Sequence, residues 1–176
     1  GRWSIWADPL YDGPVPGGLT DSELLDVRMR HHAGPADLTF AAWRGSDPSL
    51  DPANDMRQWR AVIDAHESYD ELILWFEHDL FDQLNLIQLL NWLPAAVRRN
   101  KTVTLVCIDA FPGHPAFKGL GELQPGELAS LLPARQPVTA AQYAVATSAW
   151  QAFCQPEPSA LDDLRRSPQT ALPFLA

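Results

Sequence analysis

Two short, continuous runs of apolar residues are the plainest feature of the hydrophobic pattern along the chain. They lie at 71–76 (ELILWF) and 102–108 (TVTLVCI), and polar or turn-forming residues bound each of them. Runs of this kind are typical of strands that are covered on both faces, as in a parallel sheet. An aromatic stretch at 3–6 (WSIW) leads into an Ala-Asp-Pro turn. It predicts a third short strand, ahead of the other two.

Helices are expected where a capping residue precedes apolar positions at helical spacing. Thr20 with Glu23, and Thr139 with Gln142, have the spacing of capping boxes, and Asp79 is a good N-cap for the most apolar of the helical segments. The helices expected on this basis lie at about 20–32, 54–66, 79–93, 125–132, 139–153 and 159–166.

Strands that alternate with helices predict an α/β fold. We expect a three-layer Rossmann-like domain with a mostly parallel sheet and a helical C-terminal part. A length of 176 residues suits one domain, with the sheet at about 1–115 and the helical part at about 120–176. Three strands are few for such a sheet, so we also expect that an N-terminal strand is missing from this chain.

The charge balance narrows the classes of partner. The chain has 22 Asp and Glu against 13 Lys and Arg, which gives a net charge of -9. Such a surface repels phosphate backbones, so it disfavours nucleic acid and anionic membranes as partners. No apolar run approaches the length of a membrane span, and no signal-peptide pattern is visible. With only two cysteines, Cys107 and Cys154, the chain suits a reducing, cytoplasmic location.

Acidic and imidazole side chains follow each of the three expected strands. Asp8 follows the first, residues 77–79 (Glu-His-Asp) end the second, and Asp109 follows the third, with His114 five residues further on. Ligands of open parallel sheets bind outside the carboxyl ends of the strands. If the three strands are parallel neighbours, these groups converge on one edge of the sheet.

This convergence predicts two kinds of chemistry. Glu77, His78 and Asp79 would supply the acid, base and orienting group for proton transfer, and Asp79 with Asp109 would hold a divalent cation. Each residue also has a structural interpretation, because Asp79 suits a simple N-cap, Asp109 a turn cap and His78 a packed side chain. The residues expected to bind substrate are Asp8, Gln83, Asp109 and His114.

Residues 6–16 (WADPLYDGPVP) and 74–84 (LWFEHDLFDQL) carry a family resemblance. Together with 105–108, 117–123 and 131–133, they resemble the bacterial family called domain of unknown function 1835. The resemblance implies an α/β domain in a bacterial cytoplasm and gives no reaction. Family members usually begin with an earlier strand and an Asn-Gly-Asp turn and often continue into further helices, so the resemblance implies a shortened member or a fragment.

Two functions follow from these patterns. The first is hydrolysis or group transfer on a small polar or phosphorylated substrate at the strand ends. The second is a non-catalytic ligand-binding or protein-interaction module with a regulatory role, which the absence of the His-Glu-x-x-His, phosphate-loop and Gly-x-Ser-x-Gly motifs favours. The partner is accordingly a small polar ligand or a protein.

Overall fold

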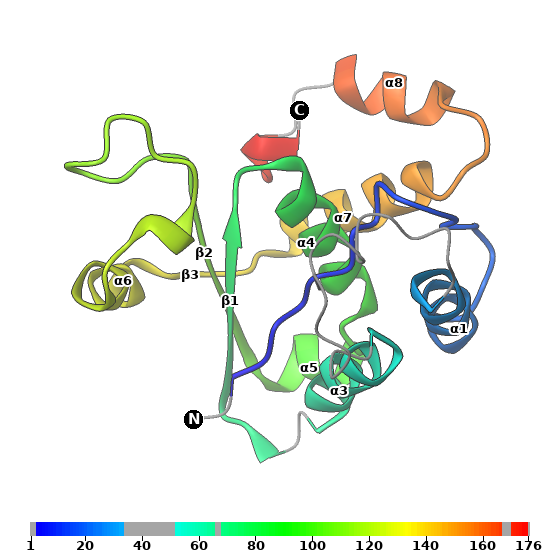
Figure 1. Ribbon diagram of the computed structural model, residues 1–176, viewed down its shortest axis with the longest axis horizontal. Coiled ribbons are helices and arrows are strands. Elements are labelled where there is room, and N and C mark those ends of the chain that lie inside the picture. Colours follow the sequence, from blue (N-terminus) through cyan, green and yellow to red (C-terminus); the bar gives the residue numbers. More distant parts are fainter. Residues whose placement is uncertain (1–2, 34–51, 66–67, 167–169, 176) are drawn as a thin grey trace.

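A computed structural model describes residues 3–33, 52–65, 68–166 and 170–175 (Figure 1). Its helices are α1 (Asp21–His32), α3 (Pro52–Asp64), α4 (Leu80–Trp92), α5 (Ala95–Asn100), α6 (Pro125–Leu131), α7 (Ala140–Phe153) and α8 (Ser159–Arg166). Its strands are β1 (Glu71–Glu77), β2 (Thr102–Ile108) and β3 (Gln136–Pro137). Short 3-10 turns complete it: η2 (Leu120–Glu122), η3 (Leu132–Ala134) and η4 (Pro173–Leu175).

The sheet of the described residues has the order β1-β2-β3. β1 and β2 are parallel, from Glu71 opposite Thr102 to Glu77 opposite Ile108. α4 and α5 form the crossover between them, as a parallel pair requires. β3 is a two-residue strand antiparallel to β2. The carboxyl ends of β1 and β2 therefore lie side by side.

The expected three-layer Rossmann-like domain with a mostly parallel sheet is wrong. The described chain is mostly helical, and its small sheet is mixed, because β3 runs antiparallel in the part expected to be helical. The expected strand at 3–6 is also wrong, since this segment is not a strand and lies along α4. The indole of Trp6 donates to Gln88 (3.0 Å), and the backbone of Asp8 exchanges two hydrogen bonds with the Asn85 side chain (3.0 and 2.8 Å). Helix side chains thus take the place of a strand partner.

The caps place most helices where they are expected. Thr20 and Glu23 form a capping box at α1, and Thr139 with Gln142 forms another at α7. Asp79 caps α4. The second helix, α3, spans Pro52–Asp64. Its expected end at residue 66 lies outside the described residues. Within the described part of the chain, no helix is both long and apolar enough to cross a membrane.

The core lies between one face of the sheet and α4. Leu74 and Phe76 of β1 share this face with Val103 of β2, because alternate residues of a strand point the same way. In Figure 1, α4, α5 and α7 lie on one side of β1, and α6 lies on the other. At the amino end of the opposite face, Glu71 accepts hydrogen bonds from Thr104 (2.8 Å) and Arg135 (2.7 Å). These bonds tie the segment after β2 to the sheet.

Candidate functional site

Four carboxylates lie around the carboxyl ends of β1 and β2, and we call Glu77, Asp79, Asp82 and Asp109 the strand-end cluster. Three of them act through their charge on the thiol of Cys107, which lies on β2. Burial, together with the charges of Asp82, Asp109 and Glu77, raises the pKa of this thiol to about 11, against the hydrogen bond from Gln83. Carboxylates from both strand ends and from α4 are therefore near enough to act on one thiol through their charge. This end of the sheet brings together the second and third of the three expected strand ends.

Asp82 links the end of β1 to the first turn of α4. Its carboxylate accepts a hydrogen bond from the backbone N–H of Glu77. Its own N–H donates to the Asp79 carboxylate (2.8 Å), which is the N-cap of α4. Burial raises the pKa of Asp82 to about 6, and the charges of Asp79 and Glu77 act in the same direction, against the hydrogen bond from Glu77. Asp82 thus titrates about two pH units above an ordinary aspartate, at about pH 6.

Glu77 holds the chain segment that follows β2. Its carboxylate accepts a hydrogen bond from the backbone N–H of Leu120 (2.6 Å). Gly119 packs directly on the same carboxylate, and a Cβ atom there would collide with it. Only glycine permits this approach without displacing Glu77. The contacts of Glu77 are those of a positioning residue, although sequence reasoning expects a catalytic one.

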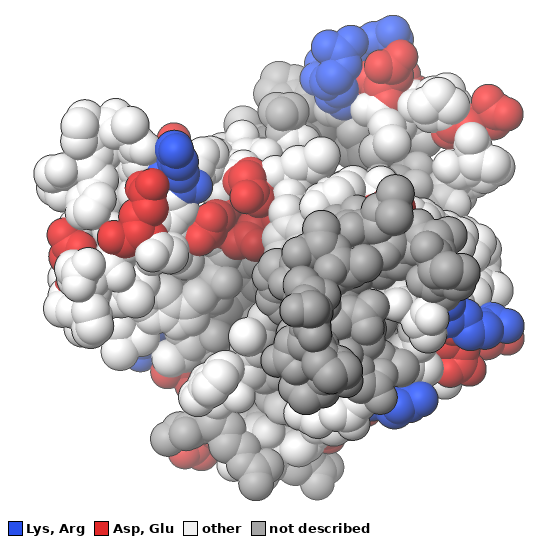
Figure 2. Space-filling view, in the orientation of Figure 1, with Lys and Arg blue, Asp and Glu red and all other residues white. Residues whose placement is uncertain are grey.

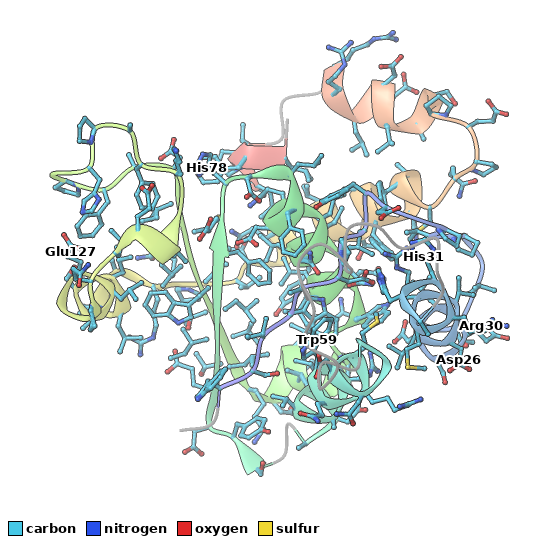
Figure 3. The ribbon with its side chains drawn as sticks, viewed as in Figure 1. Asp26, Arg30, His31, Trp59, His78 and Glu127 are labelled. Atoms are coloured by element: carbon cyan, nitrogen blue, oxygen red, sulfur yellow. The ribbon has the colours of Figure 1, made fainter. Side chains whose placement is uncertain are left out.

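Gln83 and His78 lie next to the cluster but differ in how they are bound. Gln83 is buried, and its amide donates to the backbone carbonyl of Glu77 (2.6 Å) and contacts the sulfur of Cys107 (3.5 Å). This places Gln83 as a brace, although we expect it to bind substrate. The ring centroids of His78 and Phe174 lie 6.2 Å apart. The Nδ1 atom of His78 is buried with no hydrogen-bond partner in the described part of the chain. Figure 3 places His78 at the carboxyl end of β1.

His114 is bound by α6. Its Nε2 atom lies 3.0 Å from the Glu127 carboxylate. Its ring packs between Phe111 and Phe117, with distances of 5.6 and 6.5 Å between ring centroids. Figure 3 shows Glu127 on α6, well apart from His78. The contacts of His114 are therefore those of a loop anchor and include no residue of the strand-end cluster.

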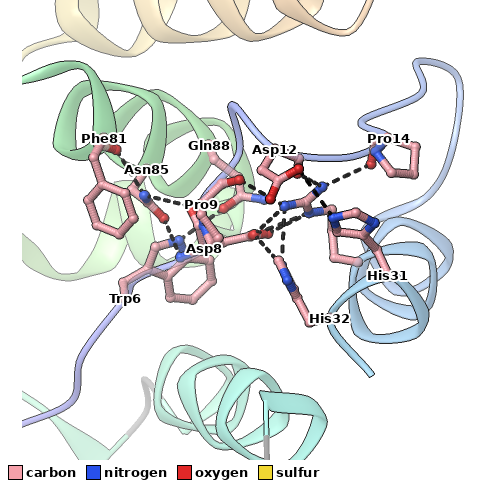
Figure 4. A network of polar contacts seen from close by, with 11 residues as sticks. Trp6, Asp8, Pro9, Asp12, Pro14, His31, His32, Phe81, Asn85 and Gln88 are labelled. Atoms are coloured by element: carbon pink, nitrogen blue, oxygen red, sulfur yellow. Dashed lines mark hydrogen bonds and ion pairs between the residues drawn. The ribbon is translucent and has the colours of Figure 1, made fainter. Parts of the chain in front are cut away.

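Asp8 belongs to a separate, buried group of charges (Figure 4), which we call the polar network: Asp8, Arg28 and His32. The Arg28 guanidinium donates to both carboxylate oxygens of Asp8, at 2.7 to 3.1 Å, and His32 Nε2 lies 2.9 Å from the same carboxylate. The side chains of Arg28 and Asp8 are 0 and 2% exposed. Burial raises the pKa of Asp8, but the hydrogen bonds from His32 and Arg28 outweigh it, and the pKa is lowered.

The rest of the Arg28 guanidinium organises the loop before α1. It donates to the backbone carbonyls of Asp12 (2.8 Å), Pro9 (3.1 Å) and Pro14 (3.2 Å). A buried guanidinium needs many acceptors, and this loop supplies them. The polar network is thus structural. The expectation that Asp8 lies with the acidic groups at the other two strand ends is wrong.

The surface around the strand ends is acidic. Figure 2 shows Asp and Glu side chains gathered between the end of β1 and the α6 segment. In the described residues, no group of three or more His, Cys, Asp or Glu is arranged to hold a metal ion. One oxygen of Asp79 already caps α4. The geometry therefore gives no support to the divalent-cation site expected at Asp79 and Asp109.

Sequence reasoning treats Asp82 only as a residue of the first helical turn. The spacing of Asp79 and Asp82 is that of an ordinary cap, so the pattern alone gives no chemical signal. Only the hydrogen bond between the Asp82 carboxylate and the end of β1 distinguishes it.

Comparison of the chain with protein-family models, curated proteins and solved structures finds no match. Function is therefore inferred from the site itself.

Proposed function

We propose that the chain acts at the carboxyl ends of β1 and β2, where Asp82 transfers a proton in a hydrolytic or group-transfer reaction on a small polar substrate. The proposal rests on the half-buried Asp82 carboxyl, which accepts a hydrogen bond from the end of β1, lies near the carboxylates of Asp79 and Glu77 and has a pKa of about 6. A carboxyl that titrates near the working pH both gives and takes a proton, which is the property a general acid–base group needs.

The charge of the cluster selects the class of substrate. Asp79 and Asp109 are exposed, and no Lys or Arg forms an ion pair with either of them in the described part of the chain. Carboxylates so arranged repel a phosphate group and attract a cation or a hydroxyl donor. The substrate we propose is therefore neutral or amine-bearing. We no longer propose a phosphorylated substrate.

The side chains divide the work in this proposal. Asp82 is the acid–base group, and Asp79 and Asp109 bind the polar or cationic part of the substrate. His78 supplies a second group for proton transfer beside them. Glu77 and Gln83 are positioning residues, because the first holds Leu120 and the second holds the end of β1.

A thermal-shift panel tests binding at this site. The probes are ethanolamine, spermidine, glucosamine, glucose and glucose phosphate, each with the wild type, Asp82→Asn and Asp26→Asn. Asp26 is an exposed carboxylate on α1 and serves as the matched control. A ligand at about a hundred times its Kd adds about 2.7 kcal/mol, or roughly 5–10 °C in a protein of this size.

We expect an amine-bearing probe to raise Tm in the wild type and in Asp26→Asn, and to lose most of this effect in Asp82→Asn. Glucose phosphate should give no rise. NMR of the mixture then follows conversion of the stabilising probe, which should stop in Asp82→Asn. A rise with ethanolamine or spermidine that is equal in all three proteins, or no rise with either of these amines, would contradict the proposal.

A protein-interaction module is the second candidate, and one observation favours it. Leu80 and Tyr11, which lie beside the strand-end cluster, are 66 and 53% exposed, and the Tyr11 ring contacts Phe81 at 6.2 Å. Exposed apolar side chains beside acidic ones suit a basic protein segment with an apolar anchor. Shifts of the Leu80 and Tyr11 amide resonances with an alternating Lys-Leu peptide, in the absence of any small-molecule effect, would favour this candidate.

We place either activity in the cytoplasm, because Cys107 and Cys154 are both free. The resemblance to the domain of unknown function 1835 family stays a hypothesis. It assigns no reaction, and neither candidate function depends on it.

A further inference from the structure

A second site lies outside the strand-end cluster. A cavity of about 190 Å³ opens between the loop that precedes α1 and the C-terminal turns of α4 and α7. The loop is fixed by a hydrogen bond from the N–H of Gly17 to the carbonyl of Cys154 (3.0 Å). Gly18 has a φ of +78°, and a Cβ on Gly17 would lie only 3.0 Å from that carbonyl. Two glycines thus form a wall without side chains, which leaves the cavity open.

Polar side chains from three elements line this cavity. Asn91 of α4 and Gln151 of α7 form two walls, and neither side-chain amide has a hydrogen-bond partner within the described residues. Asp21, at the start of α1, lines a third side. An amide donates and accepts hydrogen bonds at once, so the two free amides offer partners of both kinds.

Apolar residues, two tryptophans among them, form the rest of the lining. Trp92 and Trp150 both border the cavity, and both are buried in the protein. Ligand sites commonly combine an apolar, aromatic lining with a few polar groups that fix orientation. The cavity has this composition on a small scale.

Charge excludes two classes of ligand. The C-terminal ends of α4 and α7 meet at this cavity, and the partial negative charge of helix C-termini disfavours an anion, whereas the charge of Asp21 is already compensated by Arg60. A cationic ligand is disfavoured because Arg60 already pairs with Asp21 at 3.5 Å and stacks 5.1 Å from the centroid of the Trp92 ring. The ligand that remains is neutral and rich in hydroxyl groups.

The volume sets the size of the ligand. Pockets for drug-sized molecules measure roughly 300–1,000 Å³, and this cavity is smaller. We propose that it binds a neutral, polyhydroxylated molecule of single-ring size, of the monosaccharide class. Asn91 and Gln151 would bind its hydroxyl groups, and exposed apolar residues of the lining, Pro16 and Leu19, its C–H groups. This site is independent of the proposed function of the strand-end cluster.

NMR of the ¹⁵N-labelled chain tests this proposal. D-glucose, D-galactose and myo-inositol are titrated to about 100 mM, with ethanolamine and inorganic phosphate as charged comparison probes. We expect saturable shifts of the Asn91 and Gln151 side-chain amides and of the Trp150 indole N–H, with a Kd of roughly millimolar for at least one polyol. Ethanolamine and phosphate should leave these resonances unchanged.

The double variant Asn91→Ala, Gln151→Ala should weaken polyol binding at least about tenfold. Asn100→Ala, which removes an exposed amide from α5, is the matched control and should bind as the wild type does. If the double variant does not fold, Gln151→Ala alone serves, because this residue is exposed and its loss is tolerated. The proposal is overturned if no polyol gives saturable shifts, if only a charged probe binds, or if the variant binds as tightly as the control.

Discussion

The polar network holds one buried carboxylate and the strand-end cluster holds four, and the pKa is shifted in opposite directions at Asp8 and at Asp82. The Asp8 carboxylate accepts hydrogen bonds from Arg28 and lies 2.9 Å from His32 Nε2, and its pKa is lowered although it is buried. Asp82 is only half-buried, lies near other carboxylates and has a pKa raised to about 6. Burial acts in the same direction on both groups, so the neighbours decide the outcome.

The difference separates a structural charge from a reactive one. A carboxylate with its full set of donors is fixed in place and holds a loop together, as Asp8 does. A half-buried carboxylate near other carboxylates, with a single backbone donor, exchanges its proton at about pH 6, as Asp82 is expected to do. The acidic residues that sequence reasoning groups together at three strand ends therefore belong to two regions with different tasks.

Removal of the cation from the polar network should have the largest effect. Arg28→Met leaves Asp8 buried without its main partner, and breaking a buried ion pair costs about 3–5 kcal/mol of unfolding free energy. Urea unfolding measures this loss. Arg30→Met on the same helix is the control, since Arg30 is exposed and bonds only to a carbonyl of its own helix. A loss of less than about 1 kcal/mol in Arg28→Met would mean that the network does not hold the loop.

Gly119→Ala should have an intermediate effect, of about 2 kcal/mol, because the added methyl group collides with the Glu77 carboxylate. Gly121→Ala is the control, because nothing lies within 4 Å of a Cβ there. In a Glu77→Ala background the carboxylate is absent, so Gly119→Ala should then add little to the loss. Equal costs with and without the Glu77 carboxylate, measured by urea unfolding, would contradict the positioning role of Glu77.

Asp82→Asn should have the smallest effect and a distinctive pH dependence. The folded pKa of about 6 lies above the ordinary value of 3.8, so the folded state binds the extra proton. Unfolding free energy should therefore fall as pH rises from about 4 to about 6, and stay level above that. The half-buried position limits this loss to about 1 kcal/mol. Unfolding curves at pH 4.5 and 7.5 should show the loss in the wild type and in Asp26→Asn but not in Asp82→Asn.

Local signals in the sequence predict most of the described helices, though not α5, and two of the strands. The cap at Asp79 and the capping boxes at Thr20 and Thr139 act within one turn of their own helix, so the pattern around each is sufficient. The strand predicted at 3–6 fails because its bonds run to Gln88 of α4, which is distant in the sequence. β3 has only two residues and carries no pattern of its own.

The candidate site is predictable only in part, for the same reason. The register of β1 and β2 brings Glu77 and Asp109 together, and the order of strands and helices predicts this. The ion pair of Asp8 with Arg28 depends on the face that α1 buries. Leu24, Arg28 and His32 lie on this face at four-residue spacing, and a charged residue in line with a buried leucine is a signal that hydrophobic periodicity alone overlooks.

The protonation of Asp82 is the central claim, and NMR titration of the side-chain carboxyl carbons of ¹³C-labelled protein measures it directly. The account predicts that Asp82 titrates at a pKa of about 6 while Asp8, in the same experiment, titrates below its ordinary value. Assignment of the Asp82 signal follows from its loss in Asp82→Asn. A pKa of Asp82 at or below its ordinary value of 3.8 would contradict both the comparison of the two regions and the proton transfer proposed for the strand ends.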